Sequence, residues 1–447
     1  MSFFYNCSIH AFELAIGIAA PFNRKARQLW RGRRGLLRRI EQRERTEKET
    51  DSDTEDQRPG TIWVHCASLG EFEQGRPLIE ALRQRHPVGT AQYRRIVLTF
   101  FSPSGYEIRK DYPVPDAIYY LPADTPKNAR RFVEAVRPEQ AIFIKYEYWY
   151  NYLSALQAAG AKSCVVSALF RPDMVFFKQS AVGRFMRKTL GLLDRFFVQN
   201  EASADLLATV GFGPDRVIVS GDTRFDRVVA LAQAAAELPV VEAFVQGAEK
   251  PVMVCGSTWG PDEEILLELM HARPEMKFIV APHELDSSRI DALIQRSGRQ
   301  GVRYTAFADA DDSGSADRTA DSWLREATLL VIDTIGVLSG VYRYGRLAYI
   351  GGGFGRGIHN TLEAATWGMP VLFGPKYRAF AEAVELVERG AAVSVAGAAE
   401  LEAAVAVWVD DPAVLAEKGR RAAEYVRSRA GATAKILETI EPSAVGQ

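Results

Sequence analysis

The sequence predicts an α/β fold of two doubly wound domains, each a parallel sheet with helices on both faces. Short, almost continuously apolar runs such as 61–66 (TIWVHC) and 140–145 (QAIFIK) alternate with segments of helical spacing, which is typical of parallel strands buried on both faces. The same alternation begins again after a polar, alanine-rich junction at 222–250. The length of 447 residues also exceeds what one hydrophobic core normally organises.

The composition is that of an ordinary soluble globular protein, with 47% hydrophobic and 25% charged residues. The formal net charge of -1 gives no general attraction to nucleic acid, and we predict no such partner. Four cysteines lie far apart without a CxxC spacing, and three of them are in or beside apolar runs. We therefore expect free buried thiols in a reducing compartment, with no metal site and no cofactor.

The N-terminal stretch 2–22 is apolar and aromatic, apart from His10 and Glu13, and a basic segment follows at 23–40 (NRKARQLWRGRRGLLRRI). A secretory signal has its positive charges before the apolar stretch, and a spanning helix needs about 20 mostly apolar residues. We therefore expect residues 1–42 to lie on or dip into a membrane, with the arginines against anionic headgroups. The alternative is an amphipathic helix packed on the domain with its basic face in water.

The remaining elements follow in order. Residues 43–60 are charged and lack aromatics, which predicts a flexible linker. The first domain is expected at 61–225, with strands at 61–66, 95–100, 117–121, 140–145, 162–167 and 195–199 and helices at 72–85, 127–136 and 202–210. A junction at 226–249 leads to the second domain, 250–425, with strands at 251–256, 277–281, 328–333, 346–351 and 369–373 and helices from 380 and 413. A surface loop is expected at 309–322, and a C-terminal helix at 426–447 that can return to the first domain.

The stretch 350–365 (IGGGFGRGIHNTLEAA) reads as a strand end, a glycine turn and the start of a helix. Glycine lets the backbone approach a ligand closely, and free N–H groups at a helix start favour a phosphate. The alternative is a tight strand-to-helix connection without a ligand. As ligand contacts we single out Gly352, Gly353, Arg356, His359, Asn360 and Glu363, the last accepting hydrogen bonds from a ribose diol. The following run GMPVLFGP predicts a second loop at the same edge of the sheet.

Open parallel sheets bind ligands at the carboxyl ends of their strands. In the first half these ends carry Ser68, Gly70 and Glu71, then Ser102 and Ser104, then Glu147, Trp149 and Asn151. Glu71 suits general-base chemistry, although Ser68 and Glu71 also fit an S-x-x-E capping box. The glutamate among aromatics at 146–151 suits a sugar site, and an aromatic core patch explains it equally well.

In the second half, Ser257 and Thr258 follow one strand and His283 follows the next. The two hydroxyls suit a phosphate or simply a helix cap, and His283 suits a ligand site or an ordinary loop. Arg224 lies between the halves, where it is positioned to reach an anion.

In order along the chain, SLGEFEQGRPLIEAL, YLPADTP, EYWYN, GDTRFD, GSTWGPDEE and GGGFGRGIHNTLEAATWGMPVLFGP resemble the 3-deoxy-D-manno-octulosonic acid (Kdo) transferases of lipopolysaccharide assembly. The resemblance covers nearly the whole chain from about residue 31. It implies a GT-B glycosyltransferase whose two Rossmann-like domains face a cleft, with CMP-Kdo as donor, the lipid A precursor as acceptor, and a location at the cytoplasmic face of the inner membrane. The family's general base falls on Glu71. Its donor contacts fall on Gly352, Gly353, His359, Asn360 and Glu363, with Ser257 and Thr258 nearby.

Some positions depart from the family pattern. Glu147–Asn151 reads EYWYN, where the family has an acidic residue followed by Leu-Trp-Pro-Asn, and no arginine stands beside Pro282 and His283. The cation for the donor's carboxylate is therefore open among Arg224, Arg356 and Lys376. The alternative functions are a GT-B-fold epimerase acting on a UDP-sugar and a non-catalytic protein that binds a nucleotide sugar or a lipid.

Overall fold

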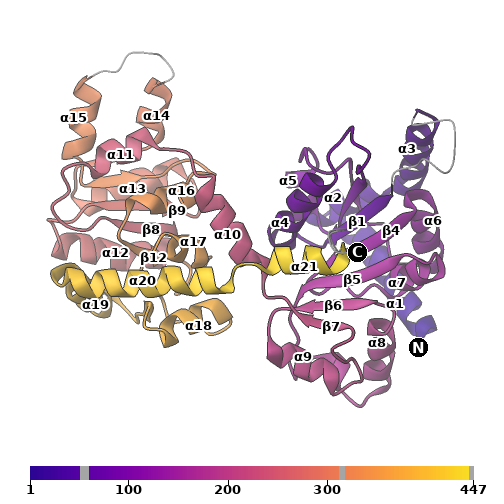
Figure 1. Cartoon of the computed structure of the whole chain (residues 1–447). Helices are drawn as coiled ribbons and strands as arrows, with labels where there is room; N and C mark the ends of the chain where they lie inside the picture. Colours follow the sequence, from indigo (N-terminus) through magenta and orange to yellow (C-terminus); the bar gives the residue numbers. More distant parts are fainter. Residues whose placement is uncertain (51–59, 312–317, 442–447) are drawn as a thin grey trace. The chain divides into compact units, whose positions relative to one another are not determined.

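The structure is a computed structural model that describes residues 1–50, 60–311 and 318–441. The chain divides into two compact units, Met1–Arg227 with Ala430–Gln447 and Val228–Arg429 (Figure 1). Each unit contains one parallel 7-stranded sheet with helices on both faces. The predicted α/β fold of two doubly wound domains is confirmed.

The first sheet has the strand order β3-β2-β1-β4-β5-β6-β7. The chain starts in the middle of the sheet, moves to one edge, and then returns to fill the other half. The switch point therefore lies between β1 and β4, where a doubly wound sheet normally binds its ligand. The strands are β1 Thr61–Cys66, β2 Arg95–Phe100, β3 Ala117–Tyr120, β4 Pro138–Ile144, β5 Lys162–Ala168, β6 Arg195–Val198 and β7 Val217–Val219.

The second sheet repeats this plan with the order β10-β11-β9-β8-β12-β13-β14. Its switch point lies between β8 and β12, which pair in parallel from Leu347 against Met253 to Ile350 against Gly256. The strands are β8 Met253–Thr258, β9 Phe278–Pro282, β10 Gly301–Arg303, β11 Leu329–Val331, β12 Leu347–Ile350, β13 Val371–Phe373 and β14 Ala392–Ser394.

Helices connect the strands and cover the sheets. Around the first sheet they are α4 Leu69–Arg85, α5 Pro103–Arg109, α6 Pro126–Val136, α7 Tyr150–Ala158, α8 Ala181–Leu190, α9 Glu201–Ala208 and α21 Ala432–Ile440, and α10 Thr223–Gln233 leads out of this unit. The second unit contains α11 Pro239–Val245, α12 Gly260–Ala272, α13 Ser287–Ser297, α14 Thr305–Asp311, α15 Arg318–Glu326, α16 Leu338–Val341, α17 Leu362–Thr366, α18 Ala381–Glu388, α19 Ala398–Asp410 and α20 Pro412–Arg429.

Three strands escaped the sequence prediction: β7, β10 and β14. Each has three residues and lies at an edge of its sheet. An edge strand is half solvated and short, so it lacks the long apolar run that identifies a buried parallel strand.

The prediction of free, buried thiols is confirmed for three cysteines. Cys66, Cys164 and Cys255 are buried and free, whereas Cys7 is free and exposed.

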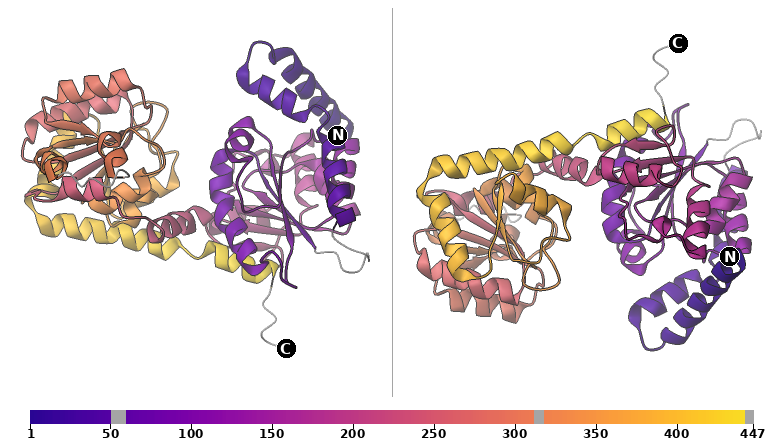
Figure 2. Two further views of the ribbon diagram at one scale, coloured as in Figure 1. Left: turned by 90° about the horizontal axis from the view of Figure 1, so that it is seen from above. Right: turned by 90° about the horizontal axis from the view of Figure 1, so that it is seen from below.

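Three helices precede the first sheet: α1 Ser2–Ala19, α2 Arg24–Arg33 and α3 Leu36–Thr50. They are indigo in Figure 2 and lie beside the sheet. Leu29, Leu36 and Ile40 are buried in the core of the first unit, so the packed-helix alternative holds for α2 and α3. For the described residues, no single helix is long and apolar enough to cross a membrane. Only α1 and α2 taken together have the required length and composition, and they form a pair bent by 119°.

The flexible linker predicted at 43–60 is wrong at its start, because α3 continues to Thr50. Glu44 is buried, and its carboxylate accepts hydrogen bonds from both Arg95 guanidinium nitrogens at 2.7 and 2.9 Å and from the Tyr119 hydroxyl at 2.9 Å. The rest of that prediction, 51–59, lies outside the described residues. The surface loop predicted at 309–322 is likewise helical at both ends, in α14 and α15, and its residues 312–317 are not described.

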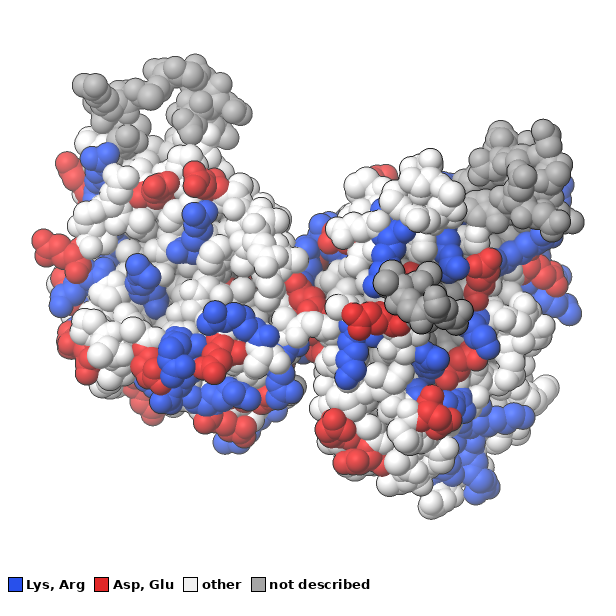
Figure 3. Space-filling model, viewed as in Figure 1, with Lys and Arg blue, Asp and Glu red and all other residues white. Residues whose placement is uncertain are grey.

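The GDTRFD segment ties the end of the chain to the first unit. The Asp226 carboxylate accepts hydrogen bonds from the Thr433 backbone N–H and hydroxyl, both at 2.7 Å, at the start of α21. Ile436 and Leu437 then pack into the apolar core beside α4. In the view shown in Figure 3, basic and acidic side chains are interspersed. On α20, for example, Arg420 pairs with Glu417 at 2.9 Å.

Candidate active site

The first candidate site lies at the switch point between β1 and β4, where the loops after both strands emerge side by side. The loop after β1 leads through Ala67 and Ser68 into α4. The residue after β4 is Lys145, which has a φ of 68°, a left-handed conformation that is unusual for a residue with a side chain. Such strain persists only where the surrounding structure holds it, and it is common at functional sites.

Glu71 is the carboxylate of the β1 loop. Its Oε2 accepts a hydrogen bond from the Ala67 backbone N–H, which turns the side chain back toward the end of β1. Burial, followed by the nearby charge of Glu147, raises the pKa of Glu71 to about 7. The Ala67 hydrogen bond and the Lys145 charge act in the opposite direction. A carboxylate with a pKa near the working pH is suited to general-base catalysis.

Glu147, in the loop after β4, is fixed by its own set of partners. Its Oε2 accepts hydrogen bonds from Trp149 Nε1 at 2.6 Å and from His65 Nε2 at 3.2 Å. With Nε2–H directed at Glu147, His65 Nδ1 accepts the hydroxyl proton of Thr99 at 2.8 Å. Trp63 Nε1 donates in turn to the Thr99 hydroxyl at 2.8 Å. This buried chain of hydrogen bonds holds Glu147 in place beside Glu71.

The predicted serines and glycine lie around these carboxylates. Ser68 accepts a hydrogen bond from the Glu71 backbone N–H at 3.4 Å, so its capping role is real. The Ser102 N–H donates to the Ala67 carbonyl at 2.8 Å, which places the β2 loop next to the β1 loop. The Ser102 and Ser104 hydroxyls share a hydrogen bond of 2.8 Å. Gly70 is exposed, and nothing in its surroundings requires a glycine.

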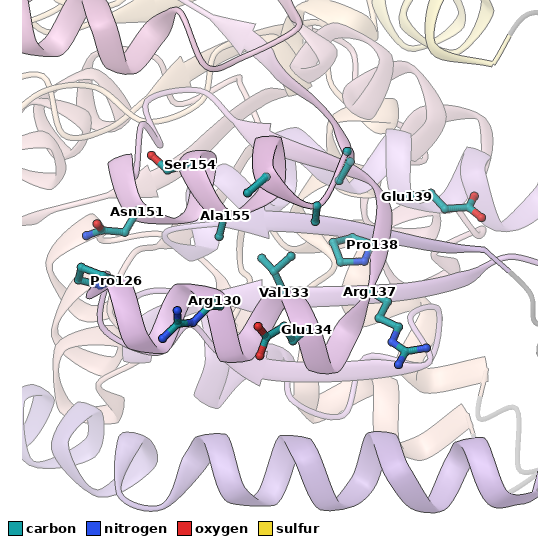
Figure 4. Close-up of a pocket in the computed structure, with 14 residues that line it drawn as sticks. Pro126, Arg130, Val133, Glu134, Arg137, Pro138, Glu139, Asn151, Ser154 and Ala155 are labelled. Atoms are coloured by element: carbon teal, nitrogen blue, oxygen red, sulfur yellow. The ribbon is translucent and has the colours of Figure 1, made fainter.

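Asn151 has a structural task. Its Nδ2 donates to the Asp124 carbonyl at 2.5 Å and to Asn6 Oδ1 at 2.9 Å, so it connects α7 to α1. It also lines one end of a groove of about 870 Å³ between α6 and α7, with Arg137 and Glu139 near the other end (Figure 4). Neither Glu71 nor Glu147 lines this groove. The chemistry is therefore to be sought at the strand ends and not in the groove.

Arg224 also has a partner. Its Nε binds the buried Asp222 carboxylate at 2.8 Å, and Gln74 Nε2 binds the same carboxylate at 2.8 Å. Asp222 thus connects Gln74 of α4 with Arg224 at the start of α10, and no observation assigns Arg224 to an anion.

The second candidate site is the glycine turn after β12, at the switch point of the second unit. A Cβ atom at Gly351 would lie 2.3 Å from the Ser257 carbonyl oxygen, and one at Gly353 would lie 2.6 Å from the backbone of Gly374. Gly352 has a φ of 94°. The turn needs glycine because three backbone segments touch there. The two loops predicted to share this edge, after β12 and after β13, do meet, since the Lys376 N–H donates to the Gly353 carbonyl at 3.0 Å.

Asp262 fixes the turn to α12. Its Oδ2 accepts hydrogen bonds from the N–H groups of Gly352 at 2.8 Å and Trp259 at 2.9 Å, and its Oδ1 accepts the Tyr349 hydroxyl at 2.8 Å. The cap of α12 is therefore Trp259 with Asp262. The helix-cap alternative for Ser257 and Thr258 is wrong: Ser257 has a φ of 55°, and the Thr258 hydroxyl binds Glu263 at 3.1 Å.

Three rings cover the glycine turn. Trp259 stacks on His283, and His283 stacks on His359, with centroids 4.5 Å apart in both pairs. Trp259 Nε1–H donates to His359 Nε2 at 2.9 Å, so the proton of His359 resides on Nδ1. Burial, followed by the neighbouring His283, lowers the pKa of His359. His359 is therefore a neutral donor at Nδ1 near neutral pH.

The other residues predicted to contact the donor follow the glycine turn in the chain. Asn360 Nδ2 donates to Glu363 Oε1 at 2.9 Å, and Asn360 Oδ1 accepts the Leu362 N–H at 3.0 Å. Arg356 is exposed on the turn itself, and Lys376 Nζ donates to the Gly355 carbonyl at 2.7 Å. The predicted helix start is present but α17 has only five residues, so the contribution of a helix dipole is small.

Sequence reasoning missed His65, Thr99, Lys145 and Asp262. His65 and Thr99 lie inside apolar strands, where a lone polar residue was the available signal. Asp262 had the pattern of an acidic residue in a first helical turn. None of these signals distinguishes a site residue from a structural one without the strand order.

Comparison with known proteins finds a family model that matches the first half of the chain and relatives that match most of its length. Residues 29–227 match the family model of the 3-deoxy-D-manno-octulosonic-acid transferases (kdotransferases). The 3-deoxy-D-manno-octulosonic acid transferase of Bordetella pertussis is 27% identical over 85% of this chain and 86% of its own length. Its namesake from Aquifex aeolicus is 26% identical over 76% of this chain and 84% of its own length.

The fold is similar to that of known two-domain enzymes. The UDP-GlcNAc 2-epimerase of Neisseria meningitidis, solved with UDP-GlcNAc, superposes with a TM-score of 0.57 over 85% of this chain and 99% of its own, at 16% identity. The MnaA–UDP structure from S. aureus gives a TM-score of 0.54 over 86% and 96%, at 15% identity. At these identities the likeness concerns the GT-B-like fold alone.

Proposed function

We propose that the chain, whose residues 29–227 match the Kdo transferase family, transfers Kdo from CMP-Kdo to a hydroxyl of the lipid A precursor, with Glu71 as general base. The observation that carries the assignment of the base is the raised pKa of Glu71 beside Glu147, at the switch point of the first sheet. The names of the matching family and relatives give Kdo as the transferred sugar. CMP as the donor nucleotide and the lipid A precursor as the acceptor are proposed.

In the proposed step, Glu71 takes the proton of the acceptor hydroxyl as its oxygen attacks the anomeric carbon of Kdo. A new C–O bond forms, the bond from that carbon to the CMP phosphate breaks, and its electron pair leaves with CMP. A single displacement of this kind inverts the anomeric centre. A well-placed general base contributes roughly 10²–10⁴-fold to such a rate.

The second unit is proposed to hold the donor. The turn from Gly352 to Asn360 brings the Nδ1–H donor of His359 and the exposed Arg356 side chain to one edge of the sheet. Preorganised donors of this kind stabilise the negative charge that grows on a departing phosphate. Kdo adds a carboxylate of its own, and we assign its cation to the exposed Arg356 on the same turn, since Arg224 is paired with Asp222.

Release of CMP tests this function. We expect CMP to appear from CMP-Kdo only when the lipid A precursor is added, because the acceptor hydroxyl is the nucleophile. Under the same conditions UDP-GlcNAc should remain unchanged, which separates a transferase from an epimerase of the same fold. CMP release that does not respond to the acceptor, or epimerisation of UDP-GlcNAc, would rule the proposal out.

The pH dependence of transfer follows from the Glu71 pKa. The active form of a general base is the carboxylate, so the rate should rise with pH through about 7. Replacing Glu147 by Gln removes the second cause of the raised pKa and leaves burial, the first. The rising limb of the pH–rate profile in Glu147→Gln should therefore move to lower pH. A limb that stays in place would show that Glu147 does not act on the titrating group.

We also propose that the N-terminal helices bind the cytoplasmic face of the inner membrane. Large apolar side chains of α1 and the turn after it are exposed: Phe3 71%, Phe4 68%, Leu14 66%, Ile18 65% and Phe22 88%. Leu14 and Ile18 are four residues apart and therefore share one side of α1, and exposed apolar surface of this kind marks a membrane or protein contact. The basic residues of α2 lie beside it and suit anionic headgroups.

Substitution tests this better than deletion, since Leu29, Leu36 and Ile40 belong to the core. Replacing Ile18 and Phe22 together by Glu should abolish sedimentation with phosphatidylglycerol vesicles, because two charges would have to enter the apolar boundary. Val88→Glu places one such charge on an exposed apolar residue outside the N-terminal helices and should sediment as the wild type does. Equal sedimentation of all three proteins would exclude the membrane role.

A further inference from the structure

A row of three aromatic rings connects the N-terminal helix to the carboxylate pair. We name Phe12, Phe101 and Trp149 the aromatic row. Phe12 and Phe101 are stacked with centroids 5.9 Å apart and an interplanar angle of 23°, and Phe101 and Trp149 are stacked at 5.0 Å and 22°. The rings come from α1, from the loop after β2 and from the loop after β4, so three separate segments converge to form the row.

The inner end of the row is polar. Trp149 donates its Nε1–H to Glu147 Oε2 at 2.6 Å, and Glu147 is the charge that acts on Glu71. Trp149 and Phe101 are half-buried, and the Arg33 guanidinium lies over the Phe101 ring at 4.7 Å. Arg33 is itself ion-paired with Glu13 of α1, which fixes the row to the N-terminal helices from a second side.

The outer end is apolar and open. Phe12 is 44% exposed, and Leu14 and Ile18 further along α1 are more exposed still. The row therefore leads from a partly exposed ring of α1 to Trp149, which donates a hydrogen bond to Glu147, the neighbour of the proposed base. A ligand that follows it would need a sugar hydroxyl at one end and hydrocarbon at the other. Sites of this composition, apolar walls with a few polar groups at one point, are typical of amphiphilic ligands.

We infer that the aromatic row is the binding surface for an acylated sugar acceptor, whose sugar lies at Trp149 and whose acyl chains run along Phe12 and α1. The inference rests on the proposed transferase function and adds the part of the chain that recognises the lipid portion of the acceptor. Phe12 thereby becomes a determinant of specificity for acylated over deacylated acceptors, and α1 becomes part of the substrate site as well as a proposed membrane contact.

The experiment compares Phe12→Ala with wild type on two acceptors in detergent micelles, where no membrane is needed: the acylated lipid A precursor and its fully deacylated, water-soluble form. We expect kcat/KM for the acylated acceptor to fall about tenfold in Phe12→Ala, the order of one lost aromatic contact with a ligand. For the deacylated acceptor it should change less than about twofold. Phe12→Leu keeps an apolar side chain but no ring, so its kcat/KM for the acylated acceptor should lie between those of the wild type and Phe12→Ala.

Val88→Ala, which also trims an exposed apolar residue of the first unit, is the control and should leave both values unchanged. Equal losses on both acceptors in Phe12→Ala, or no loss on either, would overturn the aromatic row while leaving the transferase function intact. A wild-type protein that uses neither acceptor would overturn the proposed function and the row together. Unchanged binding of CMP-Kdo by each variant shows that the variants are folded.

Discussion

Replacing Glu71 by Gln should lower Kdo transfer by roughly 10²–10⁴-fold, the usual contribution of a positioned general base. Glutamine keeps the size of the side chain, and its amide oxygen can still accept the Ala67 N–H, so the start of α4 should not change. The amide cannot take a proton near neutral pH. The effect should therefore appear in kcat, measured at saturating donor and acceptor.

Donor binding supplies the other half of this prediction. Glu71 belongs to the first unit and the glycine turn to the second, so Glu71→Gln should bind CMP-Kdo as tightly as the wild type in a calorimetric titration. Glu80→Gln makes the same chemical change later on α4, where Glu80 pairs with Arg76 at 2.7 Å, and should transfer Kdo normally. A Glu71→Gln protein that loses the donor but keeps residual turnover would be incompatible with a base at this position.

Replacing Gly353 by Ala should weaken CMP-Kdo binding about tenfold or more. The new Cβ would lie 2.6 Å from both the N and the Cα of Gly374, which are backbone atoms and cannot rotate away. Overpacking of this kind costs roughly 1–3 kcal/mol of stability, which the turn avoids by moving away from Gly374. Restoring the binding geometry would then cost a similar free energy, and 1.4 kcal/mol corresponds to about tenfold in affinity. The glycine turn and the neighbouring loop would have to separate, and the side chains of Arg356 and His359, which are proposed to face the donor, would move.

Gly355→Ala is the matched control for this substitution. It lies two residues further on the same turn, and the nearest atom to its Cβ would be the Gly352 carbonyl oxygen at 3.5 Å, an ordinary contact. We expect its affinity for CMP-Kdo to remain within about twofold of the wild type. If both alanine variants bound CMP-Kdo as tightly as the wild type, the turn would not contact the donor.

Long buried strands made the fold predictable from the sequence. Runs such as TIWVHC and QAIFIK are apolar on both faces because helices cover both sides of the sheet, and this pattern is easy to recognise. The edge strands β7, β10 and β14 have only three residues and gave no such pattern. Residues 43–50 of α3 were mistaken for part of a linker because their composition is polar, although arginine, glutamate and lysine are all strong helix formers.

The site was predictable one residue at a time but not as a pair. Glu71 and Glu147 each follow a strand, and that much can be read from the sequence. Their proximity depends on β1 pairing with β4, although β2 and β3 come between them in the chain. The buried connection from Trp63 through Thr99 and His65 to Glu147 joins β1, β2 and the loop after β4, so only the register of the sheet brings it together. Asn151 was expected at the site from its position after β4, but its side chain binds Asn6 and so connects α7 to α1.

Mass spectrometry of the lipid A precursor after incubation with CMP-Kdo tests the central claim most directly. The wild-type protein should add the mass of Kdo to the acceptor, and Glu71→Gln, with its donor site equally occupied, should leave the acceptor unmodified over the same time. An acceptor unmodified by the wild type, or one modified equally by the variant, would contradict a Kdo transferase that uses Glu71 as its base.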